Sequence, residues 1–347
     1  MKIFPHTLAL ITTDRCTAAC DDCCFECTPQ KNTYIPHNKM IEVINDAKKI
    51  KSIKNIVFTG GECFTLGNKL KELIFLATKN NFNTRVVTNG YWAKNDIYTS
   101  KVCSEIRKAG LNEVNFSTGH SHAKYVPVEN IIRAAHFCTE EGMTVVINIE
   151  NHVDEEKSEV SIRIKNDELI KSALKKGKLK LINNFWVKED NKKNKVKIKN
   201  IMQGCQTIMN VLAITPSLSL VPCCGIRLEK IKDIHLGSLS NNRLHNLIES
   251  ADDDLMKMML NIYGPEYLIN EAKKIDRSID VPEYFVHPCE YCEYIYRESR
   301  IKNALIKYAR KNEKEILTLF MAGFFGKAKG ITNDYQEDHH SIPVKDI

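Results

Sequence analysis

Three cysteines lie close together near the start of the chain, at Cys16, Cys20 and Cys23. They follow an apolar run at residues 7–13 that predicts a β-strand, so the cysteines fall on the loop after it. Three thiolates on one loop can bind three irons of a [4Fe–4S] cube and leave the fourth iron open. Structural zinc fits this spacing less well, because its sites use paired Cys-x2-Cys knuckles and four ligands.

The chain has 347 residues and 13 cysteines, and nothing in its first residues resembles a secretory signal peptide. We therefore expect a cytoplasmic protein, in which clustered cysteines are metal ligands or reactive thiols rather than disulfides. No apolar run approaches the ~20 residues that a membrane-spanning helix needs. The formal net charge is +7, and residues 154–203 hold 14 Lys and Arg against 8 Asp and Glu. Because these lysines are not interleaved with aromatic residues, we expect no nucleic-acid binding; the stretch is a solvated face or a docking surface for an acidic partner.

A second short motif, Gly60-Gly61-Glu62, follows the apolar run at residues 55–59. In parallel α/β folds, ligands bind where strands end. Two glycines allow a close backbone approach, and a carboxylate accepts hydrogen bonds from an amine. A Cys-x3-Cys-x2-Cys loop followed by Gly-Gly-Glu resembles the radical S-adenosylmethionine superfamily.

This resemblance implies roles for the residues named above. Cys16, Cys20 and Cys23 would hold the cube, and its open iron would chelate the amino and carboxylate groups of S-adenosylmethionine. Gly60, Gly61 and Glu62 would contact the amino group of that cofactor. Further cofactor contacts are expected after the third and fourth strands, at Asn89 within the segment Thr88-Asn89-Gly90 and at Ser117. Such enzymes also need an electron donor, such as flavodoxin or ferredoxin.

The remaining clustered cysteines lie in the second half of the chain, at Cys205, Cys223, Cys224, Cys289 and Cys292. Their arrangement resembles the Twitch form of the SPASM auxiliary domain, in which four cysteines hold a second [4Fe–4S] cluster. The match assigns Cys205, Cys223, Cys289 and Cys292 to that cluster, and Cys223 and Cys224 can exchange roles. The alternative is a zinc knuckle that stabilises the C-terminal region.

The elements that position these motifs alternate between strand and helix patterns up to about residue 190. Repeated βα units predict a parallel sheet, and six strands are too few for a closed eight-stranded barrel. We therefore expect a partial (β/α)6 barrel over residues 1–190 and a smaller α+β domain over residues 191–347. The strands of the barrel are expected at residues 7–13, 55–59, 84–88, 113–117, 144–149 and 179–187. The second domain should contain a hairpin at residues 211–221 and helices at residues 242–262, 294–310 and 313–325.

Within the superfamily, the motifs are most similar to radical epimerases that act on ribosomally made peptides. That resemblance implies Cα epimerisation of a precursor peptide, with Cys224 returning a hydrogen atom to the substrate. A thiol suits this role because its S–H bond is weak and it stays protonated near neutral pH. Two other reactions remain open: crosslinking of a peptide, through a thioether or a carbon–carbon bond, and dehydrogenation of a small aminocyclitol.

Overall fold

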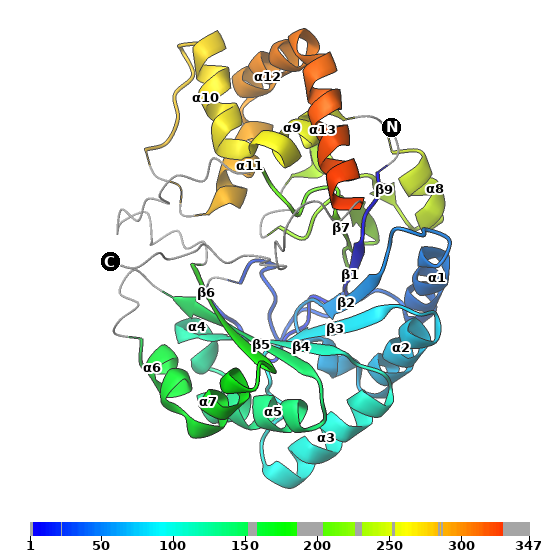
Figure 1. The fold of residues 1–347 in the computed structure, drawn as a ribbon, viewed down its shortest axis with the longest axis vertical. Coiled ribbons are helices and arrows are strands. Elements are labelled where there is room, and N and C mark those ends of the chain that lie inside the picture. The colour runs from blue at the N-terminus through cyan, green and yellow to red at the C-terminus, as the bar shows by residue number, and fades with distance from the viewer. Residues whose placement is uncertain are drawn as a thin grey trace.

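A computed structural model describes residues 3–21, 23–151, 158–185, 204–225, 231–251, 254–283, 285 and 287–328. In these residues, nine strands form one sheet in the order β6-β5-β4-β3-β2-β1-β7-β8-β9 (Figure 1). The first seven strands pair in parallel, and β8 and β9 pair antiparallel. The strands are β1 (Thr7–Ile11), β2 (Asn55–Thr59), β3 (Asn83–Thr88), β4 (Glu113–Gly119), β5 (Thr144–Asn151), β6 (Leu179–Phe185), β7 (Val211–Ile214), β8 (Ser219–Val221) and β9 (Gly237–Ser238).

The six strands expected for the barrel are all present, and helices of the βα units cover one face of the sheet (Figure 1). These helices bury alternate strand residues such as Leu8, Leu10 and Phe58, all fully buried. The alternation arises because successive strand residues point to opposite faces. The helices are α1 (His37–Ala47), α2 (Asn68–Lys79), α3 (Asp96–Lys108), α4 (His120–Ala123), α5 (Val128–Glu140), α6 (Glu159–Asn166) and α7 (Glu168–Lys175).

The opposite face of the sheet, which we call the inner face, carries a separate small apolar cluster of Ala9, Ile11, Val57, Ala213 and Val221. These residues come from the four strands β2, β1, β7 and β8, which are neighbours in the sheet. Phe25 from the first cysteine loop packs against the cluster, as do Cys223 and Cys224 from the second cysteine group. The inner face therefore contacts both cysteine groups that the sequence singles out.

The expected domain boundary near residue 190 lies outside the described residues. Beyond it the chain first returns to the same sheet, because β7 pairs in parallel with β1. The hairpin expected at residues 211–221 is present as β7 and β8. The helices that follow are α8 (Leu244–Glu249), α9 (Leu255–Tyr263), α10 (Pro265–Ile275), α11 (Pro288–Arg297), α12 (Ser299–Lys311) and α13 (Glu313–Ala328). Helices α9 to α13 gather at one end of the molecule, whereas α8 lies beside α1 (Figure 1).

Two helices predicted as continuous are each divided, and one helix was not expected. The stretch 242–262 forms α8 and α9, and Asp254 starts α9 by accepting a hydrogen bond from the backbone of Lys257. Similarly, the stretch 294–310 is shared between α11 and α12, which meet at Glu298. The unexpected helix α10 begins with Pro265 in its first turn, where proline is well tolerated. Among the described residues, no helix combines the length and apolarity needed to cross a bilayer.

Candidate functional site

The first cysteine loop leaves the carboxyl end of β1 and is held by its own backbone. The Cys16 amide donates to the Thr28 carbonyl at 3.1 Å, and the Cys23 amide donates to the Cys20 carbonyl at 3.2 Å. The Cys27 amide donates to the Cys23 sulfur at 3.3 Å. All three predicted ligand cysteines are partly exposed, whereas Cys27 is buried. The loop thus presents three thiols on a short, internally bonded turn.

The thiols of this loop have different electrostatic environments. A hydrogen bond from the Cys27 side chain is the main reason that the pKa of Cys23 falls to about 6. Burial raises the pKa of Cys16 to about 11, although the Ala18 amide, which donates to its sulfur at 3.4 Å, opposes the shift. Cys27 therefore stabilises a thiolate at Cys23. Because thiolates are the form that binds iron, this donor set suits a cluster.

Gly60 and Gly61 lie directly against the backbone of the first cysteine loop. A Cβ on Gly61 would come within 2.1 Å of the Arg15 carbonyl oxygen, and one on Gly60 within 2.6 Å of the Thr13 oxygen. Gly60 also has a φ of +130°, a conformation that disfavours any other residue. The Gly61 amide donates to Thr13 at 2.7 Å. The two glycines therefore allow the Gly-Gly-Glu segment to pack directly on the loop. This role is additional to the close approach of a ligand that the sequence suggested.

Glu62 is completely buried, and its carboxylate accepts three hydrogen bonds. Oε1 accepts from the Phe64 amide at 3.1 Å and from the Thr88 hydroxyl at 2.9 Å. Oε2 accepts from the Asn89 amide at 2.8 Å. Burial raises the pKa of Glu62 to about 7, and these three donors oppose that shift. Glu62 thus joins the segment after β2 to the turn after β3.

That turn connects Glu62 to the cysteine loop through Asn89. The Asn89 side-chain amide donates to the Thr17 hydroxyl at 3.0 Å and to the Cys16 sulfur at 3.6 Å. The Thr88 hydroxyl also accepts from the Trp92 indole nitrogen at 3.2 Å. A hydrogen bond to a ligand sulfur is one of the means by which a protein tunes an iron–sulfur cluster. Trp92 was not predicted as a site residue, because only the folded turn brings it to Thr88.

The carboxyl ends of β4 and β5 lie beside the first cysteine loop. Ser117, a predicted cofactor contact, is a half-buried residue of β4, in register with Asn148 of β5. The sequence did not single out the nearby pair of His122 and Glu150, whose Nδ1 and Oε2 atoms are 3.1 Å apart. Glu150 is buried, and its backbone and Cβ lie so close to Gly119 that a side chain there would clash. The positive charge of a protonated His122 also favours the Cys23 thiolate.

The second cysteine group is assembled from segments far apart in the chain. The Cys205 amide donates to the Leu260 carbonyl at 2.8 Å, which fixes Cys205 to helix α9. Cys223 follows β8, and Cys289 lies in the first turn of α11. A Cβ on Gly225 would be 3.1 Å from the Cys289 sulfur and 3.6 Å from the Cys223 sulfur, so both thiols border the space beside Gly225.

The four predicted ligands of this group also sense one another electrostatically. The pKa of Cys292 is raised well above its usual value by burial and then by the charges of Cys223, Cys289 and Cys205. The hydroxyl of Tyr296 is buried without a hydrogen-bond partner and interacts electrostatically with Cys292 and Cys223. Converging thiols with an unsatisfied donor beside them fit a sulfur-rich group better than an apolar core.

No three His, Cys, Asp or Glu side chains in the described parts of the chain converge on one point as ligands of a single ion. A cube makes a different demand, because each thiolate binds its own iron. The first loop offers three thiols, the number for a cube with one open iron, and the C-terminal group offers four, the number for a fully ligated cube.

Cys224 and its neighbour Cys223 have different charged neighbours. Burial raises the pKa of Cys224 to about 12, Cys205 adds to the shift, and the positive charge of Arg85 on β3 opposes it. The causes of the Cys223 shift, by contrast, include Cys289 after burial. Cys223 is therefore associated with the α11 cysteines, whereas Cys224 senses a residue of the sheet. Its high pKa keeps the Cys224 thiol protonated at neutral pH.

The two cysteine groups lie at opposite edges of the same sheet. The first loop leaves the carboxyl end of β1, whereas the antiparallel strand β8 delivers Cys223 and Cys224 to the amino end of the parallel strands. The Met209 amide, just before β7, confirms this placement by donating to the Pro222 carbonyl at 2.7 Å. Five residues of β1 at about 3.3 Å each place the two edges roughly 15 Å apart. The inner face, with its apolar cluster, lies between them.

Residues 10–149, the part of the chain that contains the first loop and Gly60-Gly61-Glu62, match the Radical SAM superfamily. Residues 10–149 therefore form a domain of that superfamily. Membership implies S-adenosylmethionine and one [4Fe–4S] cluster as cofactors. The parallel sheet with its covering helices agrees with the fold expected from the sequence.

The chain is 21% identical to YydG of Bacillus subtilis strain 168, a protein named for peptide biosynthesis, over 90% of this chain and 99% of that protein. A solved structure of anSMEcpe with S-adenosylmethionine and a peptide is similar at 15% identity and a TM-score of 0.49, covering 92% of this chain and 99% of that one. BtrN in complex with S-adenosylmethionine and 2-DOIA is similar at 12% identity and a TM-score of 0.49, covering 77% and 91%.

Proposed function

We propose that this enzyme modifies a ribosomally made peptide, and that the modification is epimerisation at Cα. The similarity to YydG along nearly the full length of both chains supports a peptide substrate. The placement of Cys224 supports epimerisation: it packs against the apolar cluster of the inner face, and its charged neighbours are Cys205 and Arg85 rather than the cysteines of α11. This placement is the observation on which the proposed reaction depends.

The carboxyl edge of the sheet holds the residues suited to the first cofactor pair. Cys16, Cys20 and Cys23 are proposed to bind the [4Fe–4S] cluster, with Cys27 and Asn89 supporting their sulfurs. The cofactor contacts are proposed to be the Gly-Gly-Glu segment, Asn89 and Ser117. When bound, these groups supply a 5′-deoxyadenosyl radical, which removes one hydrogen atom from the substrate.

The four cysteines Cys205, Cys223, Cys289 and Cys292 are proposed to bind a second [4Fe–4S] cluster. Their convergence and the buried hydroxyl of Tyr296 support this proposal. A cluster at this position would lie next to Cys224 and could carry electrons to it from flavodoxin or ferredoxin. The proposed auxiliary domain is the region after residue 190, which comprises these cysteines and the helices around them.

The role proposed for Cys224 is to complete the exchange of hydrogen at Cα. The substrate loses its Cα hydrogen atom on one face and receives the hydrogen atom of the Cys224 thiol on the other face. The S–H bond breaks as the new C–H bond forms, and a thiyl radical remains on Cys224. One electron from the donor protein and one proton from water restore the thiol. The substrate is therefore neither oxidised nor reduced.

The test is an anaerobic reaction of wild type and Cys224→Ala in deuterated water, with synthetic peptides from short reading frames flanking the gene. Wild type should add about one mass unit per modified residue, because the exchanged thiol delivers deuterium. Cys224→Ala should keep about eight irons and still cleave S-adenosylmethionine, but should form no epimer. Cys223→Ala is the matched control, and it should lose about four irons.

Two results would change the proposal. Full epimer with solvent deuterium from Cys224→Ala would remove Cys224 as the donor. If Cys224→Ala loses iron and the wild-type product is lighter by two hydrogens, Cys224 is a ligand and the reaction is crosslinking or oxidation. Consumption of 2-DOIA instead of any peptide would favour a small-molecule dehydrogenase.

A further inference from the structure

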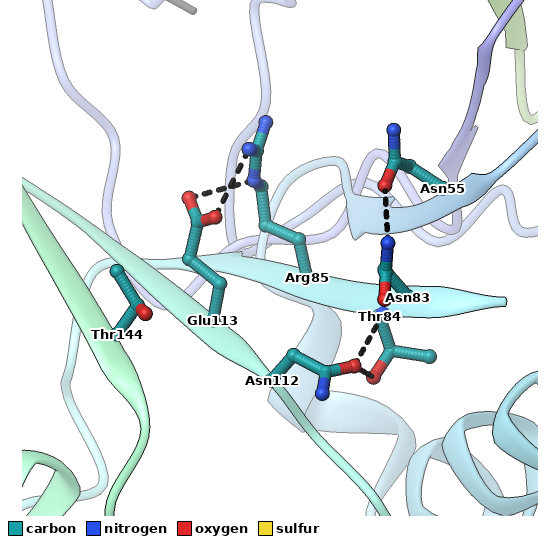
Figure 2. A pocket seen from close by; sticks show the side chains of 7 residues that line it. All are labelled: Asn55, Asn83, Thr84, Arg85, Asn112, Glu113 and Thr144. Carbon is teal, nitrogen blue, oxygen red and sulfur yellow. Dashed lines mark hydrogen bonds and ion pairs between the residues drawn. The ribbon is translucent and has the colours of Figure 1, made fainter. Parts of the chain in front are cut away.

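A polar cavity of about 240 Å³ lies at the amino edge of the parallel strands β2 to β5. It is at the same edge of the sheet as Cys224 and opposite the edge with Gly60-Gly61-Glu62. Figure 2 shows its side chains approaching one another from neighbouring strands. The cavity is lined by Asn55, Asn83, Thr84, Arg85, Asn112, Glu113 and Thr144.

Its central feature is a two-pronged ion pair between β3 and β4. Arg85 Nε is 2.7 Å from Glu113 Oε1, and Arg85 Nη2 donates to Glu113 Oε2 at 3.0 Å. Both side chains retain about a fifth of their exposure, at 21% and 20%. They project on the inner face, because the adjacent residues Thr84 and Val114 are buried on the helix side. The pair is thus fixed in place yet accessible from the cavity.

Side-chain amides and hydroxyls surround this pair. Asn83 Nδ2 donates to Asn55 Oδ1 at 3.3 Å. Asn112 Oδ1 accepts from the Thr84 backbone at 2.9 Å and from its hydroxyl at 3.2 Å. The lining therefore combines donors and acceptors, while the two formal charges cancel. A ligand suited to it is neutral and carries both donors and acceptors, whereas a phosphate or nucleotide would need a net positive site.

The cavity adjoins Cys224, the proposed hydrogen donor. The charge of Arg85 acts on Cys224, and Arg85 is in register with Val57 of the apolar cluster on the neighbouring strand. A ligand in the cavity thus has the Cys224 thiol and an apolar surface beside it. A peptide has this composition, because each residue brings a backbone N–H and C=O together with its side chain. A polyhydroxylated small molecule would leave the apolar surface uncovered.

We propose that this cavity binds the main chain of the substrate peptide, with the Arg85 guanidinium donating to a peptide carbonyl and the Glu113 carboxylate accepting from a peptide N–H. This inference rests on the proposed function, since it assumes a peptide substrate. It assigns Arg85 and Glu113 to substrate binding rather than to the stability of the sheet.

Three variants test this assignment. Arg85→Gln with Glu113→Gln removes both charges together, so that no unpaired charge remains. Thr144→Trp fills the cavity from an exposed position and leaves the ion pair intact. Lys71→Gln with Glu105→Gln is the control, since that pair joins the outer helices α2 and α3 at 2.7 Å, away from the cavity. The probe is the flanking-frame peptide that wild type converts fastest.

Both cavity variants should raise the peptide KM about tenfold or more, with kcat at saturating peptide within about twofold, as loss of uniform binding requires. The control pair should leave KM unchanged. Iron content and the thermal midpoint of unfolding report whether each variant folds. If the double variant loses iron, the KM of Thr144→Trp alone tests the inference. An unchanged KM in a folded cavity variant overturns the inference while leaving the peptide substrate in place. If wild type converts no peptide and consumes 2-DOIA, both proposals fall.

Discussion

The two cysteine groups reach similar chemical compositions by opposite structural routes. The first places Cys16, Cys20 and Cys23 within eight residues of sequence, on a loop held by its own backbone hydrogen bonds. The second collects cysteines between residues 205 and 292 from the segment before β7, the end of β8 and helix α11. The first is a local structure, and the second exists only once distant segments have packed.

This difference has consequences for stability and function. Closing long loops costs entropy before any ligand contact compensates for it. Metal binding at the second group should therefore be strongly coupled to the packing of the C-terminal helices. The first loop has that support already, because Gly60 and Gly61 dock on its backbone and Asn89 contacts the Cys16 sulfur. The variants below test whether the two groups behave as independent sites.

The largest effect is expected from replacing Cys16, Cys20 and Cys23 together with alanine. Cleavage of S-adenosylmethionine should become undetectable, because that chemistry depends on the first cluster. Iron analysis after anaerobic reconstitution should still find about four of about eight irons. If all iron disappeared, iron binding at the second group would depend on the first group, and the two groups would not be independent sites.

The converse change, Cys289→Ala with Cys292→Ala, should remove the second cluster but not the first. We expect about four irons and continued formation of 5′-deoxyadenosine, with little or no modified peptide. Because α11 would lose its bound group, the thermal midpoint should fall more than in the first variant. Circular dichroism and product analysis measure both effects. Stoichiometric zinc in the wild-type protein would instead support the knuckle interpretation of this group.

Glu62→Gln should weaken S-adenosylmethionine binding about tenfold or more, with both clusters in place. A direct carboxylate–ammonium contact predicts this loss. So does the observed network, in which Glu62 holds the Thr88–Asn89 turn. Thr88→Val distinguishes these two explanations, because it removes one hydrogen-bond donor to Glu62 but leaves the Glu62 carboxylate in place.

The pH dependence of binding sharpens this test. Burial raises the pKa of Glu62 to about 7, so the carboxylate form increases as the pH rises through 7. Affinity measured by calorimetry should therefore rise over that range in wild type and stay flat in Glu62→Gln. An unchanged isotherm for Glu62→Gln would remove Glu62 from the cofactor site.

Periodicity predicted the sheet well but the C-terminal helices poorly. The strands of the βα units are short apolar runs flanked by polar turns, and all six were found within a few residues of their predicted ends. The breaks between α8 and α9 and between α11 and α12 were missed, because helical spacing continues across them. Only the caps at Asp254 and Glu298 mark the new starts.

The site shows a similar division. Cysteine spacing and Gly-Gly-Glu identified residues whose partners are close in sequence or belong to a known motif. The Thr88–Trp92 contact, the His122–Glu150 pair and the Arg85–Glu113 pair depend on strand register. Arg85 and Glu113 become neighbours only when β3 and β4 pair in parallel. A charged residue near the start of each strand was the available signal, and it does not specify its partner.

The smallest effect is expected at Asp46, which joins the two regions. On α1, its buried carboxylate accepts from the Leu244 amide of α8 at 3.1 Å and from Lys49 at 2.8 Å, and His245 Nδ1 lies 3.1 Å away. Although burial opposes the shift, these partners lower the pKa of Asp46 below 3.8. Asp46→Asn should lower the free energy of unfolding by about 1–2 kcal/mol at pH 7, measured by urea denaturation.

The sign of the pH dependence follows from that lowered pKa. A carboxyl with a depressed folded pKa contributes its stability fully above the unfolded value and loses it as the pH falls through the folded value. The difference between wild type and Asp46→Asn should thus stay constant from pH 7 to about 5 and shrink only near and below 3.8. The control is Asp233→Asn, which breaks an ion pair with Lys302 that is more exposed than the contacts of Asp46. It should leave the midpoint of urea denaturation unchanged. A difference that instead grew on acidification would mean that the charge of Asp46 opposes the contact between α1 and α8, and that the two regions are held together by apolar packing alone.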